Sequence, residues 1–195
     1  MNQDDILDAL REEVPVEVYR RNEYDVLREQ GRGSCVQATR MGIEALRYFG
    51  VPAKPLVTLM GVGNAAWVEW MEAGGPAASD MPEAAWAVGT DPTERPNERG
   101  YPAHLVIEID GHLLDLDAMI SARPERGIHV PPTLLIPLRD GDVVATTALA
   151  EGGLAFYKAH TPKLNFREIG AWRDSRKWTG PVIRRMRDRL DRKEE

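Results

Sequence analysis

The sequence is poor in cysteine, with one thiol, Cys35, in 195 residues. A single cysteine cannot form an internal disulfide, so nothing in the chain requires an oxidising compartment. No stretch approaches the roughly 20 apolar residues that a membrane-spanning helix needs. The acidic N-terminus lacks the basic start and the apolar core of a signal peptide. We therefore expect a cytoplasmic protein with no membrane partner.

Acidic side chains outnumber basic ones, 31 to 25, and the common cofactor motifs are missing from the sequence. The net charge is −6, which argues against a general nucleic-acid-binding protein. The stretch "GVGNAA" is too short, and lies in the wrong context, for a phosphate-binding or dinucleotide-binding loop. His129 and His160 have no cysteine or carboxylate at metal-ligand spacing. We expect no metal, no cofactor and no nucleic-acid partner.

The pattern that is present runs from helices to strands and back to helices. Apolar residues at helical spacing predict a helix over residues 3–12 and, after an interruption at Pro15, a second over about 16–29. A third helix opens near Cys35, and its apolar residues surround it, which is typical of a buried central helix. Strand-like runs follow at "KPLVTLMGV", "TLLIPL", "DVVATTAL" and "LAFYK". This order predicts an α+β fold.

The chain length fits one domain, and composition divides it into five segments. The last segment is expected to end in a helix that has Thr179 and Pro181 in its first turn. The expected organisation is a single domain over 1–195, with N-terminal helices over 1–30, a nucleophile loop, central helix and first strand over 31–62, a tryptophan-rich insertion over 63–100, an antiparallel sheet over 101–160 and a helical tail over 161–195.

The stretch "HLVIEIDGHLLDLD" predicts a β-hairpin with a two-residue turn at Asp110 and Gly111. Alternation then gives the hairpin two faces. His104 and Asp117 face each other on the polar side, with Cβ atoms at about 5 Å, which suits a hydrogen bond between imidazole and carboxylate. Asp115, diagonal to His104, is the competing partner. The alternative is a surface contact of small energetic value. The expected core face consists of Leu105, Ile107, Ile109, Leu114 and Leu116.

Cys35 follows a glycine-rich loop and lies at the start of the predicted central helix. The N-terminus of a helix favours negative charge, which suits a thiolate, and the Cys35 N–H can donate to an oxyanion. The alternative is that Cys35 is a small buried apolar side chain, as most free cysteines are. The chain order of cysteine, histidine and aspartate supplies a nucleophile, a base and a group that orients the base.

These pieces resemble the transglutaminase-like superfamily, which shares its catalytic core with papain-like peptidases and arylamine N-acetyltransferases. The resemblance covers residues 28–120 and is carried by "GSC" opening a helix, "GVPAKPLV", "AHLVIEI" and "LLDLDAM". It implies a papain/transglutaminase-like core, in which the helix bearing the cysteine packs on an antiparallel sheet, and a triad of Cys35, His104 and Asp117. "RGSC" and "QGRGSC" also resemble family segments, which makes Arg32 and Gln30 candidates for oxyanion or substrate binding.

The expected activity is therefore acyl transfer through a thioester on Cys35, with a peptide or amide, free or within a protein, as substrate. Water as the final acceptor gives a cysteine peptidase or amidase, which is the simpler default. An amine acceptor gives a transglutaminase or N-acetyltransferase type of reaction. Trp67 and Trp70 are candidates for a wall of the substrate site, or they pack the insertion onto the domain. A non-catalytic binding or assembly module that retains the fold is the remaining alternative.

Overall fold

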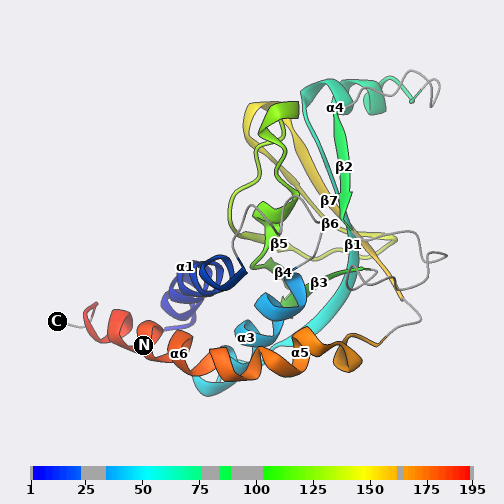
Figure 1. Ribbon diagram of the computed structural model, residues 1–195. Helices are drawn as coiled ribbons and strands as arrows, with labels where there is room; N and C mark the ends of the chain where they lie inside the picture. Colours follow the sequence, from blue (N-terminus) through cyan, green and yellow to red (C-terminus); the bar gives the residue numbers. More distant parts are fainter. Residues whose placement is uncertain (1, 23–33, 76–83, 89–102, 162–164, 194–195) are drawn as a thin grey trace.

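The computed structural model describes residues 2–22, 34–75, 84–88, 103–161 and 165–193. In these residues the chain forms α-helices and a seven-stranded antiparallel sheet, which confirms the α+β prediction (Figure 1). The helices are α1 (Gln3–Asn22), α3 (Cys35–Tyr48), α4 (Ala65–Glu72), α5 (Gly170–Asp174) and α6 (Arg176–Asp191). The strands are β1 (Lys54–Gly63), β2 (Ala85–Val88), β3 (His104–Ile109), β4 (His112–Asp115), β5 (Leu134–Pro137), β6 (Val143–Ala148) and β7 (Leu154–Ala159). Short 3₁₀ helices cover η2 (Ala118–Ser121), η3 (Pro124–Arg126), η4 (Ala150–Gly152) and η5 (Phe166–Glu168).

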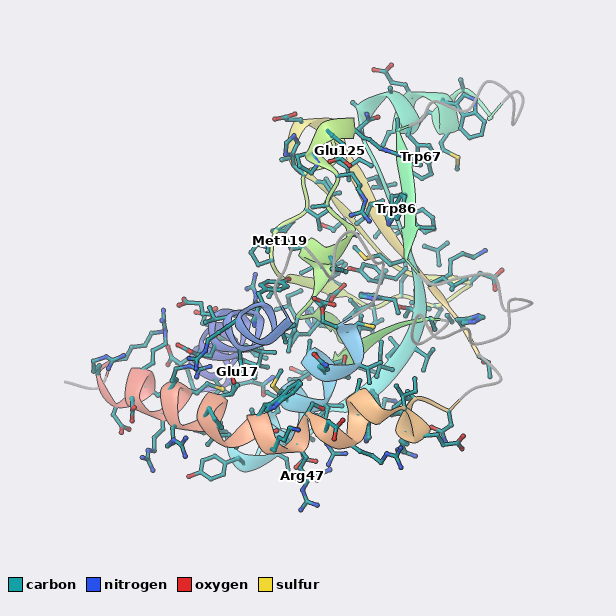
Figure 2. The ribbon with its side chains drawn as sticks, viewed as in Figure 1. Glu17, Arg47, Trp67, Trp86, Met119 and Glu125 are labelled. Carbon is teal, nitrogen blue, oxygen red and sulfur yellow. The ribbon has the colours of Figure 1, made fainter. Side chains whose placement is uncertain are left out.

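The long strand β1 organises the sheet. The strand order is β5-β4-β3-β1-β7-β6, and β2 pairs with the C-terminal half of β1. Strands β5 and β6, at the two ends of this order, contact each other, so the sheet is strongly curved and nearly closed. Helices α1, α3 and α6 gather at one end of β1, whereas α4, which carries Trp67, lies at the other end (Figures 1 and 2). In the described part of the chain, every helix is too short or too polar to cross a membrane.

The hairpin of β3 and β4 has the predicted turn and register. Asp110 and Gly111 both have positive φ angles, 45° and 70°, as a type I′ turn requires. Ile109 pairs directly with His112 across the turn. The sequence signal was strong here because only a few residue types tolerate two consecutive positive φ angles.

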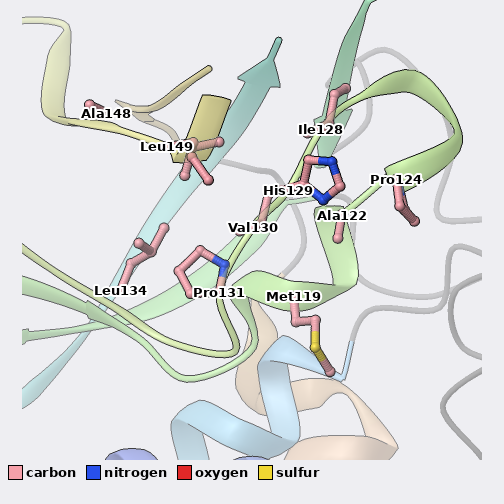
Figure 3. A pocket seen from close by; sticks show the side chains of 11 residues that line it. Met119, Ala122, Pro124, Ile128, His129, Val130, Pro131, Leu134, Ala148 and Leu149 are labelled. Atoms are coloured by element: carbon pink, nitrogen blue, oxygen red, sulfur yellow. The ribbon is translucent and has the colours of Figure 1, made fainter. Parts of the chain in front are cut away.

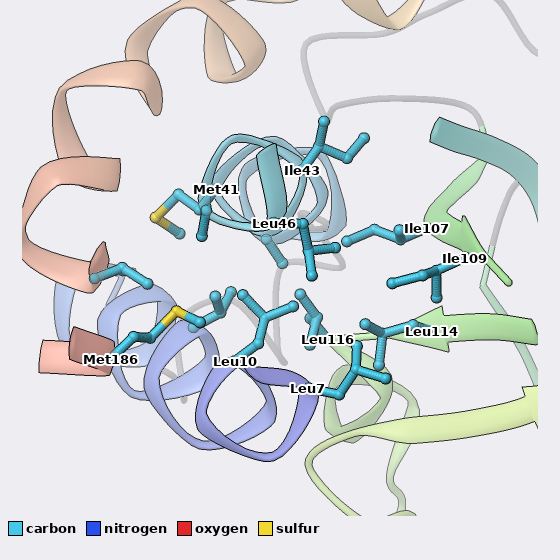
Figure 4. Packing of buried hydrophobic residues seen from close by; sticks show 14 of the residues in the cluster. Leu7, Leu10, Met41, Ile43, Leu46, Ile107, Ile109, Leu114, Leu116 and Met186 are labelled. Carbon is cyan, nitrogen blue, oxygen red and sulfur yellow. The ribbon is translucent and has the colours of Figure 1, made fainter. Parts of the chain in front are cut away.

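The main core lies between α3, α1, α6 and one face of this hairpin (Figure 4). The five residues predicted for the core face of the hairpin are all in this cluster. Helix α3 approaches the hairpin closely at Gly42, where a Cβ atom would lie 2.5 Å from Ile107 Cδ1 and 2.6 Å from Leu116 Cδ1. This close approach sets the distance between α3 and β3, and so helps to set the position of Cys35 at the start of α3.

The opposite face of the hairpin, predicted to be polar, is also buried. Val106 and Leu113 belong to a second apolar cluster, together with Tyr157 of β7 and Ile128. The sheet curves over this face and the segment 118–130 covers it, which a register argument on two strands cannot anticipate. His104 therefore lies inside the molecule, at 0% exposure, and not on a surface.

Two prolines predicted to mark helix boundaries lie inside helices. Pro15 does not interrupt α1, and Pro181 lies in the second turn of α6, which begins at Arg176. Each proline removes one helical hydrogen bond. Burial of neighbouring side chains offsets this cost, with Val14 and Val182 both fully buried. Tertiary packing, and not the position of the proline, therefore determines where α1 continues and where α6 begins. The predicted end of the helix over 16–29 lies outside the described residues.

The last helix is tied to the first by ion pairs. Arg185 of α6 lies 2.6 Å from Glu13 and 3.0 Å from Glu17 of α1, and Lys193 lies 2.8 Å from Asp5. The acidic N-terminal segment and the basic tail therefore neutralise each other across the helix pair that supports α3.

Candidate active site

Cys35 is the first residue of α3, as predicted, and its side chain is 1% exposed. The preceding residue, Ser34, does not cap the helix with its side chain. The backbone N–H groups of the first helical turn have no partner within the helix, and they favour negative charge nearby. One turn along α3, the Thr39 hydroxyl donates a 2.8 Å hydrogen bond to the carbonyl of Leu105. This bond ties the start of the cysteine helix to the start of β3.

His104 is the first residue of β3, opposite Thr58 of β1. Its Nε2 lies 2.6 Å from Asp115 Oδ2, and both side chains are buried. Its Nδ1 is buried as well, and makes no hydrogen bond of ordinary geometry with any described residue. The side chain of Cys35 nevertheless contributes to raising the pKa of His104. The thiol and the imidazole are therefore neighbours in the buried site.

The electrostatics of the site favour a protonated His104. Burial by itself lowers the pKa of His104, because it removes water from the imidazolium. The charge and hydrogen bond of Asp115, together with the Cys35 side chain, outweigh burial and hold the pKa of His104 well above its usual value. The site thus contains a buried imidazolium paired with a carboxylate at neutral pH.

Asp115, the competing partner in the sequence argument, is the carboxylate that His104 contacts. Its Oδ2 also accepts a 2.8 Å hydrogen bond from the Tyr157 hydroxyl, and its Oδ1 accepts a 2.9 Å bond from the backbone N–H of Asp117. Strand β4 ends at Asp115, and the chain then turns into η2. The alternation that was expected to bring Asp117 opposite His104 therefore stops two residues too early.

Asp117 lies beside the pair and links it to the cysteine helix. The Ser34 hydroxyl donates to the Asp117 carboxylate, at 2.7 Å from one oxygen and 2.8 Å from the other. Burial raises the pKa of Asp117 to about 7, with the Asp115 charge adding to it, although the Ser34 bond and the charge of His104 act in the opposite direction. Asp117 thus connects Ser34, the residue before Cys35, to the end of the hairpin through a hydrogen bond.

The raised pKa of Asp117 predicts a pH-dependent stability. The folded state holds the Asp117 proton more tightly than the unfolded state does, so its stabilising contribution is full below about pH 4. It is lost as the pH rises to about 7, at a slope of at most about 1.4 kcal/mol per pH unit. Asp117→Asn cannot ionise. The difference in unfolding free energy between wild type and Asp117→Asn, measured by urea denaturation, should therefore fall from pH 4 to pH 7.

A control for that series is Asp110→Asn, in the exposed hairpin turn. The same subtraction for Asp110→Asn measures how much of any slope comes from replacing an exposed carboxylate of the same hairpin. If the wild type and Asp117→Asn have parallel pH profiles, Asp117 does not titrate in the way that its burial implies.

The other predicted site residues are not near His104 where they are described. Trp67 lies on α4 at the far end of β1 and stacks on Phe156, with ring centroids 5.8 Å apart (Figure 2). Trp70 is on the same short helix. Gln30 and Arg32 lie outside the described residues. The structure therefore brings together Cys35 and His104 from the predicted set, with Asp117 linked to them through Ser34 and Asp115.

Sequence reasoning did not single out Ser34 or Tyr157. Tyr157 lies on β7, which pairs with β1, and it reaches Asp115 across the curved interior of the sheet. Its strand was predicted, but the sequence carries no signal for a curvature that brings β7 within reach of β4. Ser34 had a weak signal, because serine before a helix usually caps it. Here its hydroxyl bonds an aspartate instead.

No group of three or more histidine, cysteine, aspartate or glutamate side chains within the described residues has the geometry of a metal site. Comparison of the chain with protein-family models, with curated proteins and with solved structures finds no significant match. The function is therefore inferred from the residues of the site themselves.

Proposed function

We propose that the protein catalyses acyl transfer through a thioester on Cys35, with His104 as the proton carrier and Asp115 as the group that orients it. The observation that carries the proposal is the arrangement around His104. Asp115 holds one ring nitrogen at 2.6 Å, the other nitrogen is buried without a hydrogen-bond partner among the described residues, and the Cys35 side chain contributes to the raised pKa of the ring. A nucleophile, a base and an orienting carboxylate are the three roles of a thiol acyl-transfer site.

The first step, the transfer of the Cys35 thiol proton to His104, is already complete in the resting site, which holds a thiolate beside the imidazolium. An imidazolium beside sulfur, with the N-terminus of α3 on the other side, stabilises the resulting thiolate. The raised pKa of His104 supports this step, because it keeps the proton on the imidazole. Asp115 stabilises that positive charge and fixes the orientation of the ring.

In the second step the thiolate attacks the carbonyl carbon of an amide, and a carbon–sulfur bond forms. Backbone N–H groups at the start of α3 stabilise the oxyanion of the tetrahedral intermediate. The carbon–nitrogen bond then breaks as the imidazolium gives its proton to the leaving amine, which leaves a thioester and a neutral His104. In the last step His104 takes a proton from water while the water oxygen attacks the thioester. The carbon–sulfur bond breaks, which releases a carboxylic acid and restores the thiolate and imidazolium.

Tyr157 and Asp117 act as positioning residues in this scheme. The Tyr157 hydroxyl and the Asp117 N–H hold both oxygens of Asp115, so the carboxylate cannot rotate away from His104. The Asp117 side chain holds Ser34, next to Cys35. Together these bonds connect β4, β7 and α3 at the point where the reaction takes place.

The arrangement of the fold is compatible with a papain/transglutaminase-like core, which remains part of the proposal. The helix that begins at Cys35 packs directly against β3, the strand that begins at His104. Hydrolysis is the default reaction because it needs only water as acceptor. An amine acceptor, as in transglutaminases and N-acetyltransferases, is the alternative. The single thiol has to stay reduced to react, which fits the cytoplasm.

A non-catalytic binding or assembly module is the second candidate, and one observation favours it. Cys35 is 1% exposed and His104 is 0% exposed, so the thiol has little contact with solvent. In that case the polar cluster would only fix the position of α3 on the sheet. Buried polar networks whose members are hydrogen-bonded also serve such a structural role.

The deciding experiment is to search for a covalent acyl-enzyme. Wild type and Cys35→Ala are incubated with a panel of acyl donors, and the intact protein is analysed by mass spectrometry. We expect an adduct on wild type with the mass of the acyl group minus one hydrogen, and none on Cys35→Ala. Decay of the adduct in water alone indicates hydrolysis, whereas decay only after an amine is added indicates a transferase. Equal labelling of the two proteins would rule out a thioester on Cys35.

A further inference from the structure

One cavity that the reaction scheme does not use has a volume of about 590 Å³. It lies between the segment that follows Asp117 and the end of β6 (Figure 3). Met119, Ile128 and Leu134 line it on one side, and Ala148 and Leu149 on the other. Its volume falls within the range of about 300–1,000 Å³ that is usual for small-molecule sites.

Two lining residues relate the cavity to the proposed site, one by strand pairing and one by its place in the sequence. Leu134 is the direct cross-strand partner of Asp115 in the β4–β5 pairing. Met119 lies two residues after Asp117, and in Figure 3 its side chain points away from the sheet toward the start of the helix that bears Cys35. Two residues of the lining are therefore neighbours, by strand pairing or along the chain, of the aspartates that hold His104 and Ser34.

The lining determines which chemical group fits. It consists of methionine, isoleucine, valine, leucine, proline and alanine side chains, with His129 as its only titratable residue. His129 is 43% exposed and lies 3.5 Å from Glu151, which is also exposed, so this pair is at the rim and not inside the cavity. Burial of an unpaired charge here would be costly, whereas burial of apolar CH₂ groups is favourable.

We propose that this cavity binds an uncharged apolar group of the acyl donor, and so directs the carbonyl toward Cys35. The inference rests on the proposed acyl-transfer function and narrows its substrate class to donors with an apolar chain or an apolar side chain. An apolar acyl chain and an apolar side chain share the same chemistry, since both present only carbon and hydrogen to the lining.

Binding can be measured without the reaction in Cys35→Ala. Three amides serve as probes in calorimetric titrations: octanoyl-glycinamide with an apolar acyl chain, acetyl-phenylalaninamide with an apolar side chain, and acetyl-glycinamide with neither. We expect at least one of the first two to bind at least 10-fold more tightly than acetyl-glycinamide. The tighter of the two identifies the source of the apolar group.

Ala148→Trp, added to Cys35→Ala, fills the cavity and should weaken that binding at least 10-fold. Ala159→Trp is the matched control, because Ala159 is also an exposed alanine at the end of a strand but does not line the cavity. Circular dichroism melting establishes that both variants fold. Equal binding of the three amides, or equal binding by the two tryptophan variants, overturns the proposal.

The same amides, incubated with proteins that retain Cys35, separate this inference from the function on which it rests. Cavity-dependent binding with no adduct on Cys35 overturns acyl transfer and leaves an apolar ligand site. An adduct whose rate of formation is the same for all three donors, and the same after Ala148→Trp, keeps acyl transfer and overturns the role of the cavity.

Discussion

Asp115→Ala is expected to lower the free energy of unfolding by about 3–5 kcal/mol, the usual cost of removing one partner of a buried ion pair. His104 would then lose the carboxylate that pairs with its charge in the interior. The Tyr157 hydroxyl and the Asp117 N–H would each lose an acceptor in a place that water does not reach. The measurement is urea denaturation at pH 6, where His104 is protonated in both the folded state and much of the unfolded state.

Glu108→Ala provides the matched control on the same hairpin. Glu108 forms a 2.9 Å ion pair with Lys54, whose side chain is 67% exposed. Exposed pairs of this kind contribute about 0–1 kcal/mol, so the control should lose little. If Asp115→Ala is no less stable than Glu108→Ala, the buried cluster does not have the charge distribution described here.

The second large effect is expected for His104→Ala, which should slow formation of the acyl adduct on Cys35 by about 10²- to 10⁴-fold, the usual contribution of a positioned acid–base group. The variant has no proton acceptor for the thiol and no donor for the leaving amine. His104→Gln should be slowed to a similar extent, and it keeps more of the side-chain volume if His104→Ala folds poorly. The rate is followed by intact mass over time.

His112→Ala is the control for that comparison. His112 lies on the same hairpin, but it bonds the backbone carbonyl of Asp110 at the exposed turn. Its adduct should form at the wild-type rate. Equal slowing by His104→Ala and His112→Ala would mean that the effect is one of stability and not of proton transfer.

The sequence was sufficient for the parts of the site that depend on local signals. The Asp110–Gly111 turn set the register of the hairpin, and the register placed His104 and the carboxylates of β4 at the same end of the pair. Glycine and serine before an apolar helical pattern located the start of α3 at Cys35. These features depend on backbone conformation within a few residues, and that is the information that residue type carries best.

The remaining features depend on how the sheet closes. Whether Asp115 or Asp117 faces His104 is decided by the residue at which β4 stops, and that end follows from the covering of the hairpin by residues 118–130. Tyr157 joins the cluster only because the sheet curves far enough to bring β7 toward β4. Pro15 and Pro181 are tolerated inside helices because of packing between helices distant in sequence. None of these long-range contacts leaves a local signal in the chain.

The central claim is that Cys35 and His104 act as one unit, and the rate of alkylation of Cys35 by iodoacetamide as a function of pH tests it most directly. The measurement is made on the folded wild-type protein and on His104→Gln, with adducts counted by intact mass. We predict that Cys35 is alkylated faster in wild type than in His104→Gln, since the imidazole of His104 serves the thiol as its base. Equal rates for wild type and His104→Gln at every pH, or no alkylation of the folded protein at any pH, would contradict it.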